Sequence, residues 1–178
     1  MNHFFQNIPS CGFNFDNIYS LAVDYFPDNS HFVEVGAWYG QSTAFMAVQI
    51  INSGKKVRFD VVDTWEGSPE HHLEIGQTIY KEFLQYMEPI IHVINPIQML
   101  SLEASKLYED ESLDFVFIDA QHEYEAISAD IAAWYPKVKR GGIIGGHDYD
   151  WEGVKQAVDE HFFKPELVLS RTSWYVEK

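Results

Sequence analysis

Short apolar runs alternate with segments of helical spacing along most of this chain. The strand-like runs lie at 31–35, 57–62, 90–95, 113–119 and 142–146. Apolar residues recur every three or four positions over 14–26, 41–52, 75–87, 101–109, 122–134 and 153–162. That spacing is typical of helices with one buried face. The chain is therefore predicted to alternate strands and helices from residue 31 onwards.

Near-continuous apolar strands that alternate with helices predict a parallel sheet covered on both faces. The last two runs, "ELVLS" and "SWYVEK", are too close for a helical crossover, so we expect an antiparallel hairpin. The prediction is one α/β domain over 1–178, doubly wound and Rossmann-like, with a mostly parallel seven-stranded sheet. Residues 1–30 would form an N-terminal arm and helix, and 31–178 the core. Ligands of such sheets bind at the carboxyl ends of the strands.

Composition narrows the classes of function. The 178 residues carry a formal net charge of −15, and an acidic chain repels nucleic-acid phosphates and anionic lipids. We therefore expect no nucleic-acid partner and no membrane partner. Cys11 is the only cysteine, so no internal disulfide can form. The sequence shows neither a secretory signal nor an apolar run long enough to span a bilayer, and a cytoplasmic location is expected.

A glycine-containing loop follows the first strand-like run. Gly36 and Gly40 lie four residues apart in "EVGAWYG", and glycine permits a sharp turn or the close approach of a ligand. The dinucleotide motif G-x-G-x-x-G is absent, because Trp38 and Tyr39 stand where its middle glycine would be. The loop is either a binding loop for a ligand without a pyrophosphate or an ordinary strand-to-helix turn.

Candidate nucleoside contacts follow the second and third runs. Asp63 lies 23 residues after Gly40, where a carboxylate can accept both ribose hydroxyls or can instead cap the loop. Trp65 either flanks an adenine ring or joins the core. Gln98 and Met99 either read the edge of an adenine or pack within their loop.

Ionisable residues follow the fourth and fifth runs. Asp119 ends a buried run, where a carboxylate is costly unless it is paired with a cation. His122 has a side-chain type that titrates near neutrality, so it is either a general base or a polar helix start. Asp148 would face Asp119 across adjacent strand ends, which favours a shared metal ion, or it caps the next helix. Carboxylates suit Mg²⁺, Ca²⁺ or Mn²⁺, and the imidazole of His147 would shift the preference towards transition metals.

Several motifs together resemble a known family. They are "FVEVGAWYGQST", "VVDTW", "LDFVFIDAQHEYEAISADIAAWYPKVKRGGIIGGHDY" and "GVKQAVDEHF". From Phe32 to Phe162 the chain resembles class I S-adenosylmethionine-dependent methyltransferases, and more narrowly the macrocin- and mycinamicin-type sugar O-methyltransferases. The resemblance implies S-adenosylmethionine as cofactor, contacted by Glu34, Gly36, Ala37, Trp38, Gly40, Ser42, Asp63, Thr64, Trp65, Met99 and Asp119.

The same resemblance implies the reaction and its ionisable residues. His122 would be the catalytic base, and Asp119, His147 and Asp148 would bind a divalent cation, Mg²⁺ or Mn²⁺. His147 departs from the family pattern, because several metal-dependent relatives have a carboxylate at this position. The implied reaction is O-methylation of a small-molecule acceptor, at a sugar or phenolic hydroxyl.

The acceptor site is expected in the least regular segments, 1–13, 66–90 and 149–153. Their aromatic and imidazole residues are Phe4, Phe5, Phe13, His71, His72, Tyr80, Tyr149 and Trp151. An aromatic rim suits a sugar or phenol, and it equally suits a homodimer interface. Two other functions stay open: an NAD-dependent oxidoreductase, and a non-catalytic module that binds S-adenosylmethionine or S-adenosylhomocysteine. The absence of the middle glycine of G-x-G-x-x-G argues against the oxidoreductase. The presence of Asp119, His122 and Asp148 argues against the non-catalytic module.

Overall fold

The computed structural model describes residues 1–9, 12–67, 76–163, 165–167 and 172–178. Its strands form one sheet in the order β3-β2-β1-β4-β5-β7-β6. They are β1 (His31–Val35), β2 (Arg58–Asp63), β3 (Ile94–Gln98), β4 (Leu113–Ile118), β5 (Val138–Gly146), β6 (Glu166–Leu167) and β7 (Trp174–Glu177). Strands β1 to β5 pair in parallel, whereas β7 is antiparallel to both β5 and β6. The predicted α/β fold, with a mostly parallel sheet and an antiparallel C-terminal pair, is confirmed.

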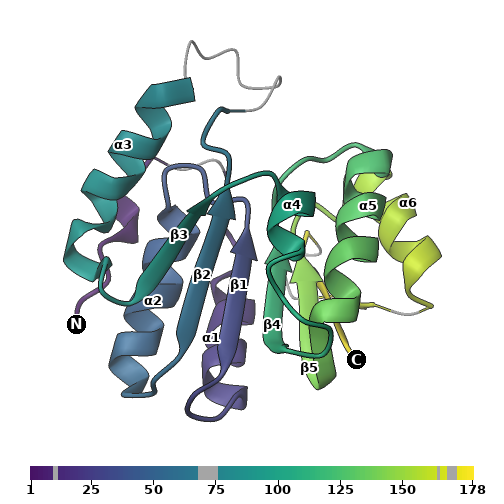
Figure 1. The fold of residues 1–178 in the computed structure, drawn as a ribbon, viewed down its shortest axis with the longest axis horizontal. Helices are drawn as coiled ribbons and strands as arrows, with labels where there is room; N and C mark the ends of the chain where they lie inside the picture. The colour runs from purple at the N-terminus through teal and green to yellow at the C-terminus, as the bar shows by residue number, and fades with distance from the viewer. Residues whose placement is uncertain (10–11, 68–75, 164, 168–171) are drawn as a thin grey trace.

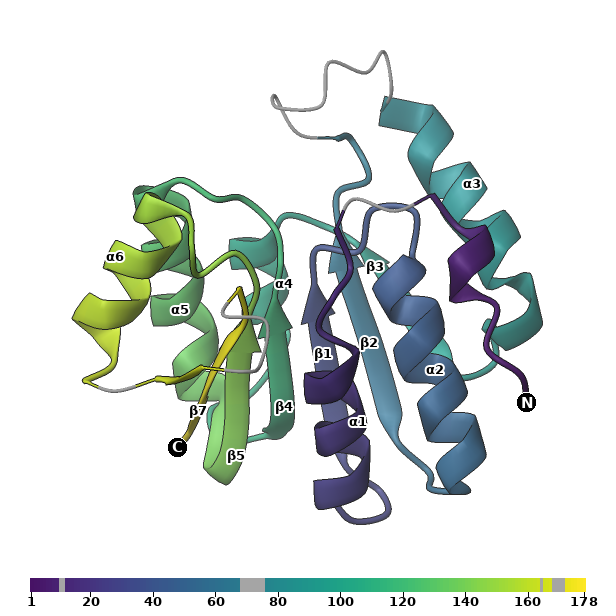
Figure 2. The ribbon, with the colours of Figure 1, turned by 180° about the vertical axis from the view of Figure 1, so that it is seen from behind.

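Helices cover both faces of the sheet (Figures 1 and 2). One face carries α1 (Asp16–Tyr25), α2 (Gln41–Ser53) and α3 (Gly76–Met87). The other carries α4 (Ser101–Ser105), α5 (Tyr124–Trp134) and α6 (Glu152–His161). Three short 3₁₀ helices complete the regular structure of the described residues: η1 (Phe5–Asn7), η2 (Glu88–Ile90) and η3 (Tyr135–Lys137). None of the described helices is both long enough and apolar enough to cross a bilayer.

Successive residues of each strand point to opposite faces of the sheet and pack into two separate core layers. Phe32 of β1 packs on the side of α1 to α3, and its neighbour Val33 packs on the side of α4 to α6. Phe117 and Ile118 of β4 divide in the same way. Because side chains alternate between the two faces of a strand, a sheet covered on both sides needs apolar residues at both parities. This is why the strands appear as continuous apolar runs.

The third strand and the fourth helix of the core differ from the prediction. The strand was expected at 90–95, but β3 covers Ile94–Gln98 and includes Pro96, which pairs with Val61. β3 is an edge strand, and an edge tolerates the missing N–H of proline. The helix expected over 101–109 is only the five residues of α4.

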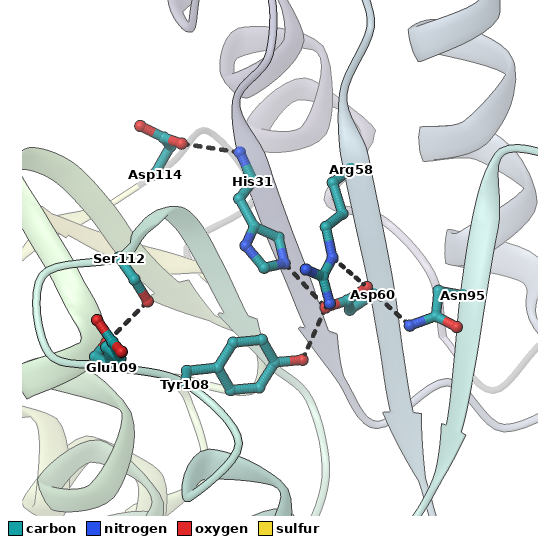
Figure 3. A network of polar contacts seen from close by, with 8 residues as sticks. All are labelled: His31, Arg58, Asp60, Asn95, Tyr108, Glu109, Ser112 and Asp114. Carbon is teal, nitrogen blue, oxygen red and sulfur yellow. Dashed lines mark hydrogen bonds and ion pairs between the residues drawn. The ribbon is translucent and has the colours of Figure 1, made fainter.

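A polar network links the amino-terminal halves of β1, β2 and β3 (Figure 3). The Asp60 carboxylate of β2 is fully buried and contacts four side chains. These contacts are His31 Nε2 at 2.8 Å, Tyr108 OH at 2.9 Å, Asn95 Nδ2 at 3.0 Å and the Arg58 guanidinium at 3.0 Å. Burial alone would raise the pKa of Asp60, but these hydrogen bonds outweigh it and lower the pKa to about 2. The network is a structural feature that joins β1, β2 and β3.

Candidate active site

A cavity of about 790 Å³ lies at the carboxyl ends of the parallel strands. It sits beside the junction of β1 and β4, where the strand order reverses direction, which is the usual ligand position in a doubly wound sheet. Every strand from β1 to β5 contributes its last residue or the segment that follows it to the cavity wall. The residues from these segments are Gly36, Ala37, Trp38, Asp63, Thr64, Met99, Leu100, Asp119, Ala120, Gln121, His122 and Asp148.

Asp63 holds the loop after β1 in place. Its Oδ2 atom accepts hydrogen bonds from the backbone N–H groups of Ala37 at 2.7 Å and Trp38 at 2.9 Å. Its Oδ1 atom accepts a third from the N–H of Trp65 at 2.6 Å. A carboxylate offers about four lone-pair sites, so Asp63 retains capacity for a further donor from the cavity that it lines. Asp63 therefore caps the loop, as its alternative interpretation predicted, and its remaining lone pairs can still accept a hydrogen bond from a ribose hydroxyl.

Gly36 allows the end of β1 to lie directly against the end of β4. Its φ is +91°, and a Cβ atom there would lie 1.9 Å from the backbone oxygen of Asp119. Only glycine combines this conformation with this approach. The glycine thus fixes the loop of Ala37 and Trp38 next to the Asp119 side of the cavity.

Glu34 lies behind the cavity wall, contrary to the expectation that it contacts the cofactor. It is 1% exposed, and it accepts hydrogen bonds from Tyr19 OH at 2.7 Å and from the Thr43 hydroxyl. Burial raises the pKa of its carboxyl group to about 7, against the opposing effect of these hydroxyl donors. Glu34 therefore joins β1 to α1 and α2, and it supports the site from behind.

Gly40 and Trp65 also lie outside the cavity lining. Gly40 precedes α2 with φ +90°, and a Cβ there would meet Phe83 and Met87. Trp65 is fully buried, packs against Phe83, and donates from Nε1 to the carbonyl of Trp38 at 3.0 Å. The structure thus places both residues behind the loop and not at the predicted contact with the cofactor, and Trp65 is part of the core, as its alternative interpretation predicted. The other expected contacts, including Ser42, Thr64 and Met99, line the cavity.

Three ionisable side chains converge after β4 and β5. Asp119, His122 and Asp148 each offer one ligand atom within 4.8 Å of the others. His122 Nε2 lies 3.0 Å from Oδ2 of Asp148. Burial, reinforced by the Asp148 carboxylate, raises the pKa of Asp119 to about 6, although His147 and His122 oppose this effect. Burial also tends to raise the pKa of Asp148, but hydrogen bonds from His122 and His147 hold that pKa well below the usual range.

His147 takes a different place from the one expected. The three-ligand group contains His122 in its place. The Nδ1 atom of His147 lies 3.2 Å from Asp148 Oδ1 and 3.7 Å from Asp119 Oδ1. Its Nε2 atom lies 2.9 Å from Oδ1 of Asn14, a residue that no motif or spacing in the sequence had indicated. The His147 side chain is only 8% exposed, so it supports the carboxylates of Asp119 and Asp148 from the protein interior. Although desolvation opposes protonation, the facing carboxylates raise the pKa of His147.

Aromatic and apolar residues border the cavity near this acidic cluster. Phe13 and Trp151, both expected in the acceptor site, line it, and the Trp151 ring centroid lies 4.7 Å from that of His122. Gln41 attaches the N-terminal arm by donating from Nε2 to the carbonyl of Phe5 at 3.3 Å. The remaining candidates lie elsewhere: Phe4, Phe5 and Tyr80 pack against the core, Tyr149 donates to Asp159, and His71 and His72 fall outside the described residues.

Comparison with known sequences identifies the family. Residues 33–149 match the model of a family described as methyltransferase domain. Over 116 residues, the chain is 28% identical to the uncharacterised protein y4gI of Sinorhizobium fredii. That alignment covers 65% of this chain but only 13% of the relative, so the chain spans a small part of that protein's length.

Comparison with solved structures agrees on the fold. The O-methyltransferase NovP superposes with a TM-score of 0.72 at 16% identity, covering 92% of this chain and 78% of that one. The calicheamicin methyltransferase CalS11 gives 0.65 at 15% identity, with 91% and 76% covered. Fibrillarin of Aeropyrum pernix, solved with natively bound S-adenosylmethionine, gives 0.58 at 14% identity, with 84% and 66% covered. At these identities the likeness concerns the fold.

Proposed function

We propose, on the premise that this chain belongs to the family of methyltransferase domains, that it methylates a hydroxyl group of a small molecule. The proposed methyl donor is S-adenosylmethionine, and the proposed acceptor is a sugar or a phenol. The observation that carries the proposal is the His122–Asp148 pair, which lies in the same cavity as the Gly36–Trp38 loop. A base and a nucleoside-sized space are thus side by side. We expect the protein to act in the cytoplasm.

The charge of the cavity supports this donor. Six carboxylate residues line it and, among the described lining residues, no lysine or arginine does. The carboxylates are Asp63, Glu66, Glu103, Asp119, Asp130 and Asp148. A lining of one sign attracts ligands of the opposite sign. The lining therefore favours a cationic sulfonium and disfavours the pyrophosphate of NAD, which agrees with the absent glycine motif.

His122 is placed to remove the proton from the acceptor hydroxyl. When its Nε2–H group donates to Asp148, the lone pair of the ring lies on Nδ1, which is then the basic atom. The Asp148 carboxylate orients the ring and stabilises the imidazolium that proton uptake creates. S-adenosylmethionine, when bound, supplies an electrophilic methyl group on sulfur. The main contribution of the protein is then to position the two reactants and accept one proton.

The chemistry of Asp119, His122 and Asp148 also fits a divalent cation, since two carboxylates and an imidazole suit Mn²⁺ or Mg²⁺. A bound cation would lower the pKa of the acceptor hydroxyl. Ligation through His122 Nε2 would replace the bond to Asp148. We therefore propose metal assistance as an addition to base catalysis, with Asp119 and Asp148 as the principal ligands.

The experiment is a comparison of ligands followed by an assay of transfer. Isothermal titration with S-adenosylmethionine, S-adenosylhomocysteine and NAD should show binding of the first two alone. Incubation with labelled S-adenosylmethionine and panels of phenols and sugars should label at least one acceptor. Binding of NAD in preference to the sulfonium would refute the proposal. Binding without transfer to any panel member would favour the non-catalytic module.

A further inference from the structure

One end of the cavity lies between α4 and α5, which stand side by side on the same face of the sheet (Figure 1). Its walls include Met99 and Leu100 from the β3–α4 connection, Ser101, Leu102 and Glu103 from α4, and Ala126, Ala129 and Asp130 from α5. Met99 follows β3, whereas His122 and Asp148 follow β4 and β5, and two strands separate β3 from β4. This end is therefore distinct from the one that holds the base.

Two charged residues line this end of the cavity, Glu103 of α4 and Asp130 of α5. Glu103 is exposed to solvent, whereas Asp130 is only 5% exposed. Its Oδ1 atom accepts a hydrogen bond of 2.5 Å from the Ser101 hydroxyl. Ser101 Oγ in turn accepts a hydrogen bond of 2.9 Å from Nε1 of Trp134. Since a hydroxyl has a single proton, this chain of bonds commits Ser101 to Asp130 and fixes the carboxylate orientation.

The carboxylate is under-satisfied for its burial. Among the described residues, the Ser101 hydroxyl is the only side-chain partner with a hydrogen bond to it, and no cation is paired with it. Burial raises the pKa of Asp130 to about 6, although the Ser101 bond opposes this effect. A buried acceptor that lacks donors is costly, so a ligand that brings an N–H group would be favoured here.

The surroundings define the shape of that ligand. Ala126 and Ala129 are small residues on the same helix as the carboxylate, and Met99 and Leu100 add apolar surface from the β3–α4 connection. A heteroaromatic ring suits this apolar lining, and an exocyclic amine on its edge would meet the acidic oxygen. A 6-aminopurine has both properties.

We propose that Asp130 accepts a hydrogen bond from the 6-amino group of adenine and thereby makes the site select aminopurine over oxopurine donors. Ser101 and Trp134 are positioning residues that orient the Asp130 carboxylate. The inference rests on the proposed function, because it names the residue that reads the base of the proposed methyl donor. A 6-oxo group would instead place an acceptor against the carboxylate, and sites built to hydrogen-bond an N–H discriminate strongly against analogues that lack it.

The test compares S-adenosylhomocysteine with S-inosylhomocysteine, which differ at the 6-position of the purine. By isothermal titration, the wild-type protein should bind the adenine compound at least about tenfold more tightly. In Asp130→Asn the carboxamide can donate to a 6-oxo group, so the preference should fall to near unity or reverse. Asp24→Asn, an exposed change on α1, is the matched control and should keep the wild-type ratio.

The outcomes separate the inference from the function on which it rests. If the wild-type protein binds neither compound, the proposed function fails. If it binds both within about twofold, or if Asp130→Asn keeps the wild-type ratio, the assignment of Asp130 is overturned while the proposed function stands. Even if the variant does not fold, a wild-type ratio within about twofold overturns the assignment. A purely structural Asp130 would lower stability without changing the ratio.

Discussion

Nε2 of His122 lies 3.0 Å from Oδ2 of Asp148, and this contact joins the segments after β4 and β5. Asp148 has a φ of +55°, a left-handed conformation that aspartate tolerates better than most residues. Its other oxygen faces Nδ1 of His147 at 3.2 Å. One carboxylate therefore lies between two imidazoles, one lining the cavity and one in the interior.

Replacing His122 with alanine should separate catalysis from cofactor binding. The loss of a general base lowers turnover by about 10²- to 10⁴-fold, whereas the Gly36–Trp38 loop and Asp63 remain in place. We expect this drop in kcat with the dissociation constant of S-adenosylhomocysteine changed by less than about threefold. Steady-state kinetics and calorimetry measure the two quantities. His92→Ala, an exposed change before β3, should behave like the wild type. Normal turnover by His122→Ala would show that another group takes the proton.

Metal removal should distinguish base catalysis alone from metal-assisted catalysis. If Asp119 and Asp148 hold a divalent cation, chelation should lower kcat by about tenfold or more, and Mg²⁺ or Mn²⁺ should restore it. Asp148→Asn should lose most of this metal response, because it removes one of the negative charges that attract the cation. Asp159→Asn, on α6 outside the cavity lining, should retain it. Equal activity before and after chelation would restrict the mechanism to His122.

The sequence predicted the convergence of Asp119 and Asp148 for a general reason. The carboxyl ends of neighbouring parallel strands meet at one edge, so residues that directly follow β4 and β5 come together. It did not predict which histidine would join them. That choice depends on the local backbone at Asp148 and on Asn14, which contacts His147 from 133 positions earlier in the chain. Neither the backbone conformation at Asp148 nor the contact between Asn14 and His147 can be recognised from a pattern in the sequence.

Glu34 could have been placed correctly from the strand period. Residues two apart in a strand share a face, so Glu34 shares the face of Phe32, which packs beneath α1 and α2. Its burial against Tyr19 and Thr43 follows from that parity. Trp65 is harder to place, because its orientation depends on a positive φ of 53° in the loop after β2. Strand residues follow alternation, whereas loop residues depend on tertiary contacts.

The buried Asp60 should make the fold sensitive to acid. Its pKa is lowered from 3.8 to about 2 in the folded chain, so its contribution is fully present above pH 3.8 and is lost as the pH falls through 2. The shift corresponds to roughly 2 kcal/mol of unfolding free energy. Asp60→Asn should therefore be less stable than the wild type at pH 6, and the gap should narrow by about that amount near pH 2. Urea unfolding at several pH values measures it. A gap independent of pH between 5 and 2 would contradict this account of Asp60.

Glu34 should have the opposite effect on stability. Burial raises its pKa from 4.5 to about 7 in the folded chain, so the folded state favours the protonated form. Its contribution to stability is greatest below pH 4.5, declines between 4.5 and 7, and is constant above 7. The shift corresponds to roughly 3 kcal/mol. Wild-type stability should fall over this interval, and Glu34→Gln should remove about that much of the decline.

The slope that remains in Glu34→Gln should come largely from Asp119 and Asp130, whose pKa values burial raises to about 6. The exposed Glu109→Gln should keep the full wild-type slope. Chemical unfolding at half-unit steps from pH 4 to 8 supplies the curves. Because glutamine keeps an acceptor for Tyr19 or Thr43, the fold should survive the change. A decline of equal size in Glu34→Gln and the wild type would show that Glu34 does not titrate in this range.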